Sequence, residues 1–498
     1  MGAVHHFEDA TTDLARMQQG ITGKWFYNFQ HTPERYPERI TEILYIALGK
    51  ITLITPFSAS TMFHIARLGA AFLMYTTLYQ LAAHIWFRVR TRRIFFFFAS
   101  IGSGFGFLLF ALMGNAESVD FTTPYIFPFY SSLVNVHYPL AIACMATLTA
   151  VIINAFRPGV NSIPSGNTGG ILILLISLIL AWILPSALIP IIASVLIITA
   201  IQWWQTRQFP LRESRWLLWL VAPALPILVY NLIFLRSNPF MQVWMSQAPH
   251  GDFNPLALLL GLGLPLWIGL PALFRAIRRF EADTDQVMII WFFTSLIVIY
   301  LPLGWSPLAL TGFMIPLGFF ATRSVEDFWL KRIPRRIWYK VMIPTVLAIS
   351  FTNLLVMLIP IAITLQNRPT ESMLPASYKS VMGWLNEHVT DKDVVLASPE
   401  VSLWIPALTA GKVVYGHPVE TIQAATKKAD VEDWYQSESP DCKGLLNGRN
   451  GFGRTYQVKY IIYGPLEKQR GLSSCLADLE LLVEIEGVKI FINPIFIR

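Results

Sequence analysis

Residues 169–203 have the sequence GGILILLISLILAWILPSALIPIIASVLIITAIQW, without a single charged side chain. One helix needs about 20 apolar residues to cross a bilayer, so this run is long enough for two. Pro185, near its middle, marks a turn between them. The segment that follows contains Arg207, Arg212 and Arg215, and loops rich in arginine and lysine remain in the cytoplasm.

The whole chain has the same character. Of its 498 residues, 54% are hydrophobic and 14% are charged, and the mean hydropathy is +0.50. Soluble domains carry about 25% charged residues, so this composition excludes an ordinary soluble protein. The net charge of +7 does not indicate nucleic-acid binding, because the cations gather in short loops between apolar stretches. The sequence predicts an α-helical polytopic membrane protein with about ten spans. They are 62–87, 94–114, 138–156, 169–185, 187–203, 216–235, 254–274, 286–302, 304–322 and 339–365.

The loops predict the orientation. Arginine and lysine are clustered in every second loop, whereas the alternate loops, including 115–137 and 236–253, contain only Arg236. Both ends of the chain are then extracytoplasmic, in the plasma membrane. An N-terminal tail would have to cross the membrane without an apolar signal, so we expect a missing first span, giving eleven, or else genuine export of the tail. The predicted domains are an external loop with juxtamembrane helices (1–61), a helical bundle (62–366) and a soluble domain (367–498).

Strand and helix patterns alternate after Pro369. Short apolar strands at 393–397, 412–415 and 458–463 are separated by helical segments, and 481–485 with 488–492 form a closing pair. This order predicts a small α/β domain with a partly parallel sheet. Cys442 and Cys475 lie in it, and an oxidising compartment would permit a disulfide between them.

Two clusters near the start of the chain are candidates for chemistry. Glu8 and Asp9, with Asp13 nearby, precede a helical stripe; they suit a general base or a metal ligand, or they stabilise a helix N-terminus. His64 and Arg67 share one face of the first predicted span. An arginine there binds a phosphate or extends to the lipid headgroups.

The outer loops supply further polar candidates. Glu117, Asp120, Asn135 and His137 lie in an aromatic, proline-broken loop that either lines a cavity or forms an interfacial belt. His250 lies in the loop 236–253, which either closes over a substrate or is simply polar.

One element of the C-terminal domain has a position typical of ligand sites. Gly416-His417-Pro418-Val419-Glu420 follows a predicted strand and precedes a helix, where α/β domains bind ligands. His417 and Glu420 could equally form a turn with a helix cap.

The first segment resembles the first external loop of GT-C glycosyltransferases, multi-span enzymes that use lipid-phosphate-linked sugars. The resemblance lies in the acidic pair Glu8-Asp9, the helix 14–17, the element Gly23-Lys24-Trp25 and the prolines that follow. The chain is also similar to a group of bacterial multi-span proteins with Asn-x-His-aromatic-Pro, here 135–139, and Gly-His-Pro-x-Glu, here 416–420. The resemblance implies that Asp9, or Glu8 second, is the catalytic base.

Together these features predict transfer of a sugar from a polyprenyl-phosphate donor to a saccharide, lipid or protein acceptor on the outer side. Arg67 is the first candidate for the donor phosphate, with Arg16 and Lys24 next. A divalent metal ion, Mg²⁺ or Mn²⁺, is an open expectation, with Asp120 as a further ligand. The alternatives are a flippase of a lipid-linked saccharide and a non-catalytic scaffold.

Overall fold

The computed structural model places most of the chain. It describes residues 6–35, 38, 43–114, 117–156, 166–237, 241–242, 254–280, 284–301, 306–367, 373–436, 442–448, 456–471 and 473–496. The chain divides into two compact units. Unit 1 contains residues 1–64, 235–248 and 360–498, and unit 2 contains residues 65–234 and 249–359.

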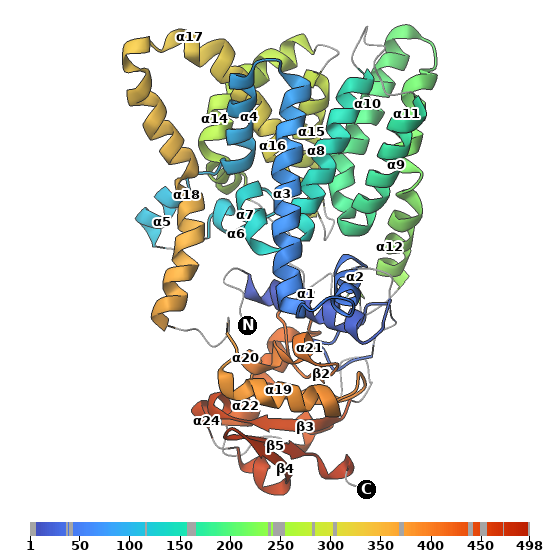
Figure 1. Cartoon of the computed structure of the whole chain (residues 1–498), viewed down its shortest axis with the longest axis vertical. Coiled ribbons are helices and arrows are strands. Elements are labelled where there is room, and N and C mark those ends of the chain that lie inside the picture. Colours follow the sequence, from blue (N-terminus) through green and yellow to red (C-terminus); the bar gives the residue numbers. More distant parts are fainter. Residues whose placement is uncertain are drawn as a thin grey trace. The chain divides into compact units, whose positions relative to one another are not determined.

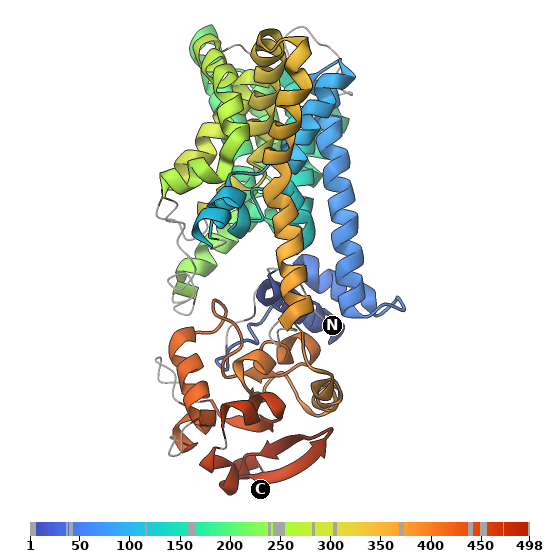
Figure 2. The same ribbon diagram turned by 90° about the vertical axis from the view of Figure 1, so that its left-hand side faces the viewer.

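Unit 2 is a bundle of long helices that run roughly along one direction (Figures 1 and 2). Buried aliphatic and aromatic side chains fill its interior, including Trp291, Phe313 and Met145. Three helices, α3 (Ala59–Ile85), α12 (Leu225–Ser237) and α18 (Trp338–Asn367), have residues in both units. The other helices of the bundle are α4 (Val89–Ile101), α5 (Gly106–Met113), α6 (Val119–Thr122), α7 (Pro128–Val134), α8 (His137–Phe156), α9 (Gly166–Ile183), α10 (Leu188–Thr206), α11 (Leu211–Val221), α14 (Pro255–Arg279), α15 (Thr284–Val298), α16 (Met314–Ser324) and α17 (Leu330–Arg332).

The apolar helices make this a multi-pass membrane protein. Within the described residues, 6 helices are long and apolar enough to cross a membrane, or up to 7 if the bent pair Ser214–Val221 and Leu225–Phe234 is one span. The expected count of ten is therefore not confirmed. The first expected span, α3, has 27 residues but is less apolar than these six, since it contains His64, Arg67 and His84. The run 169–203 breaks at a 3₁₀ turn, Pro185–Ala187, as its proline predicts.

The C-terminal part of unit 1 is an α/β domain with a five-stranded sheet in the order β2-β1-β3-β5-β4. The strands β1, β2 and β3 are parallel, and β5 pairs antiparallel with both β3 and β4. The partly parallel sheet predicted from the sequence is therefore present. The strands are β1 (Val394–Leu396), β2 (Lys412–Val413), β3 (Val458–Tyr463), β4 (Glu480–Ile485) and β5 (Val488–Ile492).

Helices cover both faces of this sheet. Successive side chains of a strand point to opposite sides, and here apolar residues lie on both sides and need to be buried. On one face Val395 and Ile462 pack with residues of α19. On the other, Leu396 and Ile461 pack with residues of α22, including Trp434. The helices of the domain are α19 (Ala376–His388), α20 (Pro399–Ser402), α21 (Ile405–Leu408), α22 (Ala424–Gln436), α23 (Cys442–Leu446) and α24 (Pro465–Arg470).

Two helices from the start of the chain, α1 (Phe7–Ile21) and α2 (Ile43–Thr52), also belong to unit 1. They cross where each has a glycine. A Cβ on Gly20 would lie 2.2 Å from the carbonyl oxygen of Ile46, and one on Gly49 would lie 2.0 Å from that of Met17. Gly20 lies inside α1 and permits this close approach.

Candidate functional site

The N-terminal segment is hydrogen-bonded to the edge of the sheet of the C-terminal domain through Gln30. The carbonyl of Gln30 accepts a hydrogen bond from the amide of Val413 at 3.1 Å. The side-chain amide of Gln30 donates to the carbonyl of Ala410 at 2.7 Å. Because β2 is an edge strand, its free backbone groups need such a cover. Residues far apart in sequence thus form one folded unit.

A buried ion pair strengthens this association. The ammonium of Lys427 donates to the carboxylate of Glu34, and neither side chain is more than 6% exposed. The Nζ of Lys412 donates to the backbone carbonyl of Glu34 at 2.7 Å. Burial lowers the pKa of Lys427 and lowers that of Lys412 to about 8, with Glu34 opposing both shifts. Breaking such a pair on one side leaves an uncompensated buried charge.

The loop after β2, residues 416–421, is closed on itself by hydrogen bonds. The amides of Gly416 and His417 donate to the hydroxyl oxygen of Thr421 at 3.2 and 3.0 Å. That hydroxyl donates to the carbonyl of His31 at 2.5 Å. A Cβ on Gly416 would lie 2.9 Å from the imidazole of His31, so the loop needs a glycine here. The loop and the N-terminal segment are therefore closely fitted.

Glu420 is the centre of a buried cluster that joins this loop to α1. Its carboxylate accepts hydrogen bonds from Nη2 of Arg16 at 2.9 Å and from the hydroxyl of Tyr27 at 2.8 Å. Nδ1 of His31 lies 3.3 Å from the same carboxylate. Arg16 also donates to Asp13, one turn before it on α1, at 2.7 Å. The cluster fixes α1 against the loop 416–421.

The charges of the cluster keep Glu420 ionised. Burial alone raises the pKa of a carboxyl group, but the positive charge of Arg16 and the imidazole of His31, 3.3 Å away, outweigh it. The pKa of Glu420 consequently lies well below its usual range.

The acidic pair lies in the first turn of α1, at the edge of this cluster. The side chain of Asp9 is 58% exposed, and its carboxylate lies 3.4 Å from Nδ1 of His6. Burial lowers the pKa of His417 to about 4, and the carboxylates of Glu420 and Asp9 act against that shift. The negative charge of Asp9 therefore influences the pKa of His417 in the loop. Glu8 is partly buried in the same turn.

Lys24, predicted to bind substrate, is paired within the same unit. Its ammonium lies 2.6 Å from the carboxylate of Asp391, and this hydrogen bond lowers the pKa of Asp391. The side chain of Lys24 is 21% exposed, so the pair lies near the surface.

In unit 2, Arg67 and the segment 128–137 come together. Arg67 donates a hydrogen bond to the carbonyl of Leu133 at the end of α7. Asn135 caps α8, since its side-chain oxygen accepts from the amide of Tyr138 at 3.1 Å, and its nitrogen lies 3.5 Å from Nε2 of His137. No ion pair joins Arg67 to any carboxylate in the part of the chain that is described, and its Nε is buried without a hydrogen-bond partner there.

Asp120 is buried, and its carboxylate is held by hydrogen bonds from its own part of the bundle. It is 1% exposed and accepts hydrogen bonds from the amides of Gly104 and Gly106, at 3.1 and 3.0 Å, and from the hydroxyl of Ser118. These contacts hold the break between α4 and α5 and satisfy the start of α5. Glu117, nearby, is exposed.

The remaining candidates are spread over the chain. The ring of His64 packs edge-on against Phe63, 5.4 Å between centroids. His250 lies outside the described residues, as does the rest of 243–253. No group of three or more histidine, cysteine, aspartate or glutamate side chains suited to a metal ion occurs within the described ranges. The divalent metal stays a prediction.

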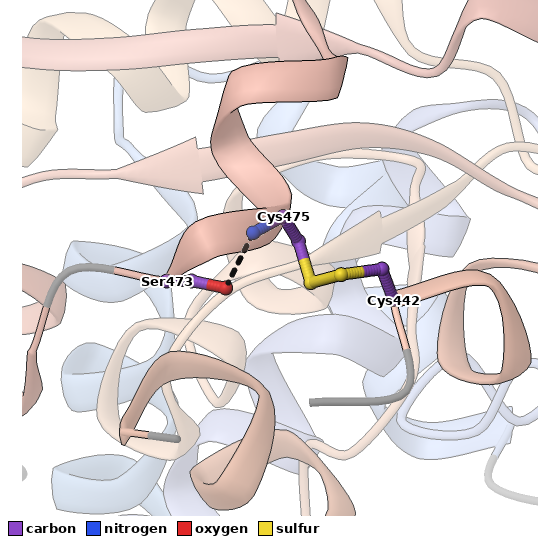
Figure 3. Close-up of a disulfide and its surroundings, with 3 residues drawn as sticks. All are labelled: Cys442, Ser473 and Cys475. Carbon is purple, nitrogen blue, oxygen red and sulfur yellow. Dashed lines mark hydrogen bonds between the residues drawn. A yellow bond between two sulfur atoms is a disulfide. The ribbon is translucent and has the colours of Figure 1, made fainter. Parts of the chain in front are cut away.

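The two cysteines of the C-terminal domain form a disulfide (Figure 3). Cys442 begins α23, and Cys475 lies in a 3₁₀ turn, 33 residues later in the sequence. The hydroxyl of Ser473 accepts a hydrogen bond from the amide of Cys475 at 3.3 Å and starts that turn. The sequence left this pairing open, since residue spacing cannot fix the distance between two cysteines.

Three members of the cluster around Glu420 were not singled out as site residues: Tyr27, His31 and, as a partner of Arg16, Asp13. Tyr27 belongs to a run of three aromatic residues, 25–27. Trp25 and Phe26 are exposed, but Tyr27 is 1% exposed and hydrogen-bonded to Glu420. No local pattern distinguishes the buried member of such a run.

Comparison with solved structures identifies similar folds. The crystal structure of ArnT from Cupriavidus metallidurans in the apo state matches with a TM-score of 0.52 at 12% identity. The same protein bound to undecaprenyl phosphate matches with a TM-score of 0.53 at 11% identity. Both matches cover 97% of this chain and 92% of ArnT. No protein family and no curated protein matches the sequence. The chain therefore shares its polytopic helical fold with these structures.

Proposed function

We propose that this membrane protein of GT-C type fold is a glycosyltransferase that takes a sugar from a polyprenyl-phosphate donor. The observation that carries the proposal is the likeness of fold over 97% of the chain to a protein solved with undecaprenyl phosphate bound. A polyprenyl tail needs lipid around it, and the bundle of unit 2 supplies apolar helices of membrane-spanning length.

Asp9 is the proposed base. Asp13 and Glu420 are buried and are held by Arg16, so they serve to position α1. Asp9, in contrast, exposes 58% of its side chain while its helix is held rigidly. In the reaction Asp9 accepts the proton of the acceptor hydroxyl, whose oxygen bonds to the anomeric carbon. The bond from that carbon to the phosphate oxygen breaks, and polyprenyl phosphate leaves with the electron pair.

Arg67 is the proposed phosphate-binding residue. The charge of Arg16 is balanced by two carboxylates, and that of Lys24 is paired with Asp391. Arg67 meets only a backbone carbonyl among the described residues, so its charge remains available to an anion. A divalent metal ion is an optional part of the proposal.

The outer side of the plasma membrane is the proposed location of the C-terminal domain. The disulfide between Cys442 and Cys475 supports this placement, because disulfides persist in oxidising compartments. The arginine clusters of the connecting loops support it independently. The test is a fusion after residue 498 to a reporter that functions only in the cytoplasm. Activity of this fused reporter would contradict the proposed location.

The proposal is tested with the purified full chain in liposomes. Undecaprenyl-phosphate-linked sugars are supplied with lipid, saccharide and peptide acceptors, with Mg²⁺, with Mn²⁺ or with a chelator. Mass spectrometry then follows release of undecaprenyl phosphate and transfer of the sugar. We expect release that depends on protein and acceptor. Movement of the intact donor between leaflets without cleavage would indicate a flippase instead, and neither result would indicate a scaffold.

A further inference from the structure

His417 has one nitrogen whose role is fixed by its own loop. Nδ1 accepts hydrogen bonds from the amides of Val419 and Glu420, each at 3.1 Å. A ring nitrogen that accepts two amide protons carries no proton of its own, so the proton of the neutral ring is on Nε2. Burial lowers the pKa of His417 to about 4, which keeps the ring neutral at physiological pH. The ring is a fixed, neutral donor through Nε2.

That donor has no hydrogen-bond partner in the described part of the chain. His417 is 4% exposed, and Nε2 is buried. In the neighbouring imidazole, His31, Nε2 lies 3.4 Å from the carbonyl of Leu403, and Nδ1 lies 3.3 Å from the carboxylate of Glu420. Buried donors are almost always satisfied, and an exception calls for a reason such as a ligand.

The charges around His417 indicate which ligand atom suits it. The carboxylates of Glu420 and Asp9 act on the ring of His417 against the charges of Arg16 and His31. These opposing charges leave no positive surplus that would favour a phosphate. A neutral hydroxyl oxygen needs no such surplus, and the side chain of Asp9, whose charge acts on the ring, is 58% exposed.

We propose that Nε2–H of His417 donates a hydrogen bond to a sugar hydroxyl, which makes the loop 416–421 the part of the transferase site that binds the sugar. This inference rests on the proposed function. The hydroxyl belongs either to the transferred sugar or to a saccharide acceptor. Glu420 is a positioning residue in this arrangement, since it holds α1 and the loop together without itself facing the ligand.

Two variants separate binding from support of the loop. His417→Asn places an oxygen near the position of Nδ1, which keeps the acceptor for the two amides but removes the Nε2–H donor. His417→Gln places an amide nitrogen near the position of Nε2, which keeps the donor but loses the acceptor. A purely structural histidine predicts normal function for His417→Asn, whereas a ligand-binding histidine predicts the opposite.

The first measurement compares kcat/KM and Tm at pH 8. We expect His417→Asn to keep the wild-type Tm but to lose about tenfold in kcat/KM, the cost of one hydrogen bond. His417→Gln should regain part of that loss while its Tm falls. A higher KM for the donor assigns the hydroxyl to the transferred sugar. A higher KM for the acceptor assigns it to the acceptor. Wild-type kcat/KM in His417→Asn overturns the inference and leaves the proposed function standing.

The second measurement needs no turnover. Undecaprenyl phosphate with and without its sugar, and free saccharide acceptor, are added to the full chain, and the rise in Tm is recorded. We expect either the sugar-linked lipid or the acceptor to give the wild type an extra rise that His417→Asn lacks, with equal responses to the sugar-free lipid. An extra rise that is unchanged in His417→Asn, or no sugar-dependent rise in the wild type, overturns the inference. Failure of the proposed function appears separately, as a wild type that releases no undecaprenyl phosphate.

Discussion

Arg16 and Glu420 form an ion pair, with Nη2 2.9 Å from Oε1, although 404 residues separate them in the sequence. Their side chains are only 14% and 6% exposed. The pair joins the helix that carries the acidic residues Glu8 and Asp9 to a loop of the C-terminal domain. The geometry around Asp9 therefore depends on contacts made at the other end of the chain.

Replacing Glu420 should destabilise unit 1 strongly. In Glu420→Ala, Arg16 loses one of its two carboxylates, and Tyr27 loses its acceptor. We expect the free energy of unfolding to fall by about 3–5 kcal/mol, as when one partner of a buried pair is removed. Denaturant unfolding of the full chain, followed by protease protection of the C-terminal domain, measures the change.

The matched control for that variant is Glu484→Ala. The carboxylate of Glu484 lies 4.0 Å from the ammonium of Lys489, and both side chains are well exposed. The free energy of unfolding should therefore fall by less than about 1 kcal/mol. Equal effects of the two variants would show that the cluster around Glu420 contributes no more than a surface pair.

The buried pair of Glu34 and Lys427 should show coupling. Lys427→Met alone leaves the Glu34 carboxylate buried without its ammonium, and we expect a loss of about 3–5 kcal/mol. Adding Glu34→Gln removes that stranded charge, so the double variant should recover part of the loss. A double-mutant cycle with a coupling free energy near zero would contradict a direct role for the pair in holding the N-terminal segment.

The disulfide should stabilise the C-terminal domain. The bridge closes a loop across 33 residues, and chain entropy predicts about 4 kcal/mol for a loop of that length. Cys442→Ser combined with Cys475→Ser should lower the unfolding free energy of the domain by a similar amount. Cys144→Ser is the control, since that thiol is free and belongs to the other unit. An unchanged protease-protection profile in the double variant would argue against the bridge in the native protein.

Hydropathy and strand patterns predicted most of the architecture. The runs 393–397 and 458–463 became β1 and β3, and the break at Pro185 is present, because these features depend on local sequence. The count of ten spans was less secure, since it needs each helix to be both long and apolar. The helix α3 shows the difficulty, because polar side chains such as Arg67 lower its apolar character.

The candidate site could be predicted only in parts. The sequence indicated Asp9 and the element 416–420 separately, but nothing in either segment shows that the helix carrying Asp9 packs against that element. Contacts such as that between Arg16 and Glu420 leave no local periodicity. Asp120 was a candidate for substrate binding because it is acidic and lies in an outer loop. Its hydrogen bonds to Gly104 and Gly106 depend on a helix break that the hydropathy pattern does not reveal.

His417 should make stability fall in mild acid. Its folded pKa of about 4 lies below the ordinary value of 6.5, so the unfolded chain binds a proton between those values and the folded chain does not. The contribution of the neutral His417 ring to the free energy of unfolding is complete above pH 6.5. It is lost as the pH falls towards 4, on the order of 3 kcal/mol in total. Tm measured from pH 7 to pH 5 should decline in the wild type and decline less in His417→Asn. Parallel curves would contradict a buried neutral imidazole.

The most direct test of the proposed transferase is the initial rate of undecaprenyl phosphate release by Asp9→Asn in liposomes. Loss of a general base costs about 10²–10⁴-fold in rate, and we expect a loss in that range with the Tm unchanged. Glu8→Gln compares the second member of the acidic pair, and Glu484→Gln is the surface control. A wild-type rate in Asp9→Asn would contradict the assignment of the base, and a wild type without any release would contradict the transferase itself.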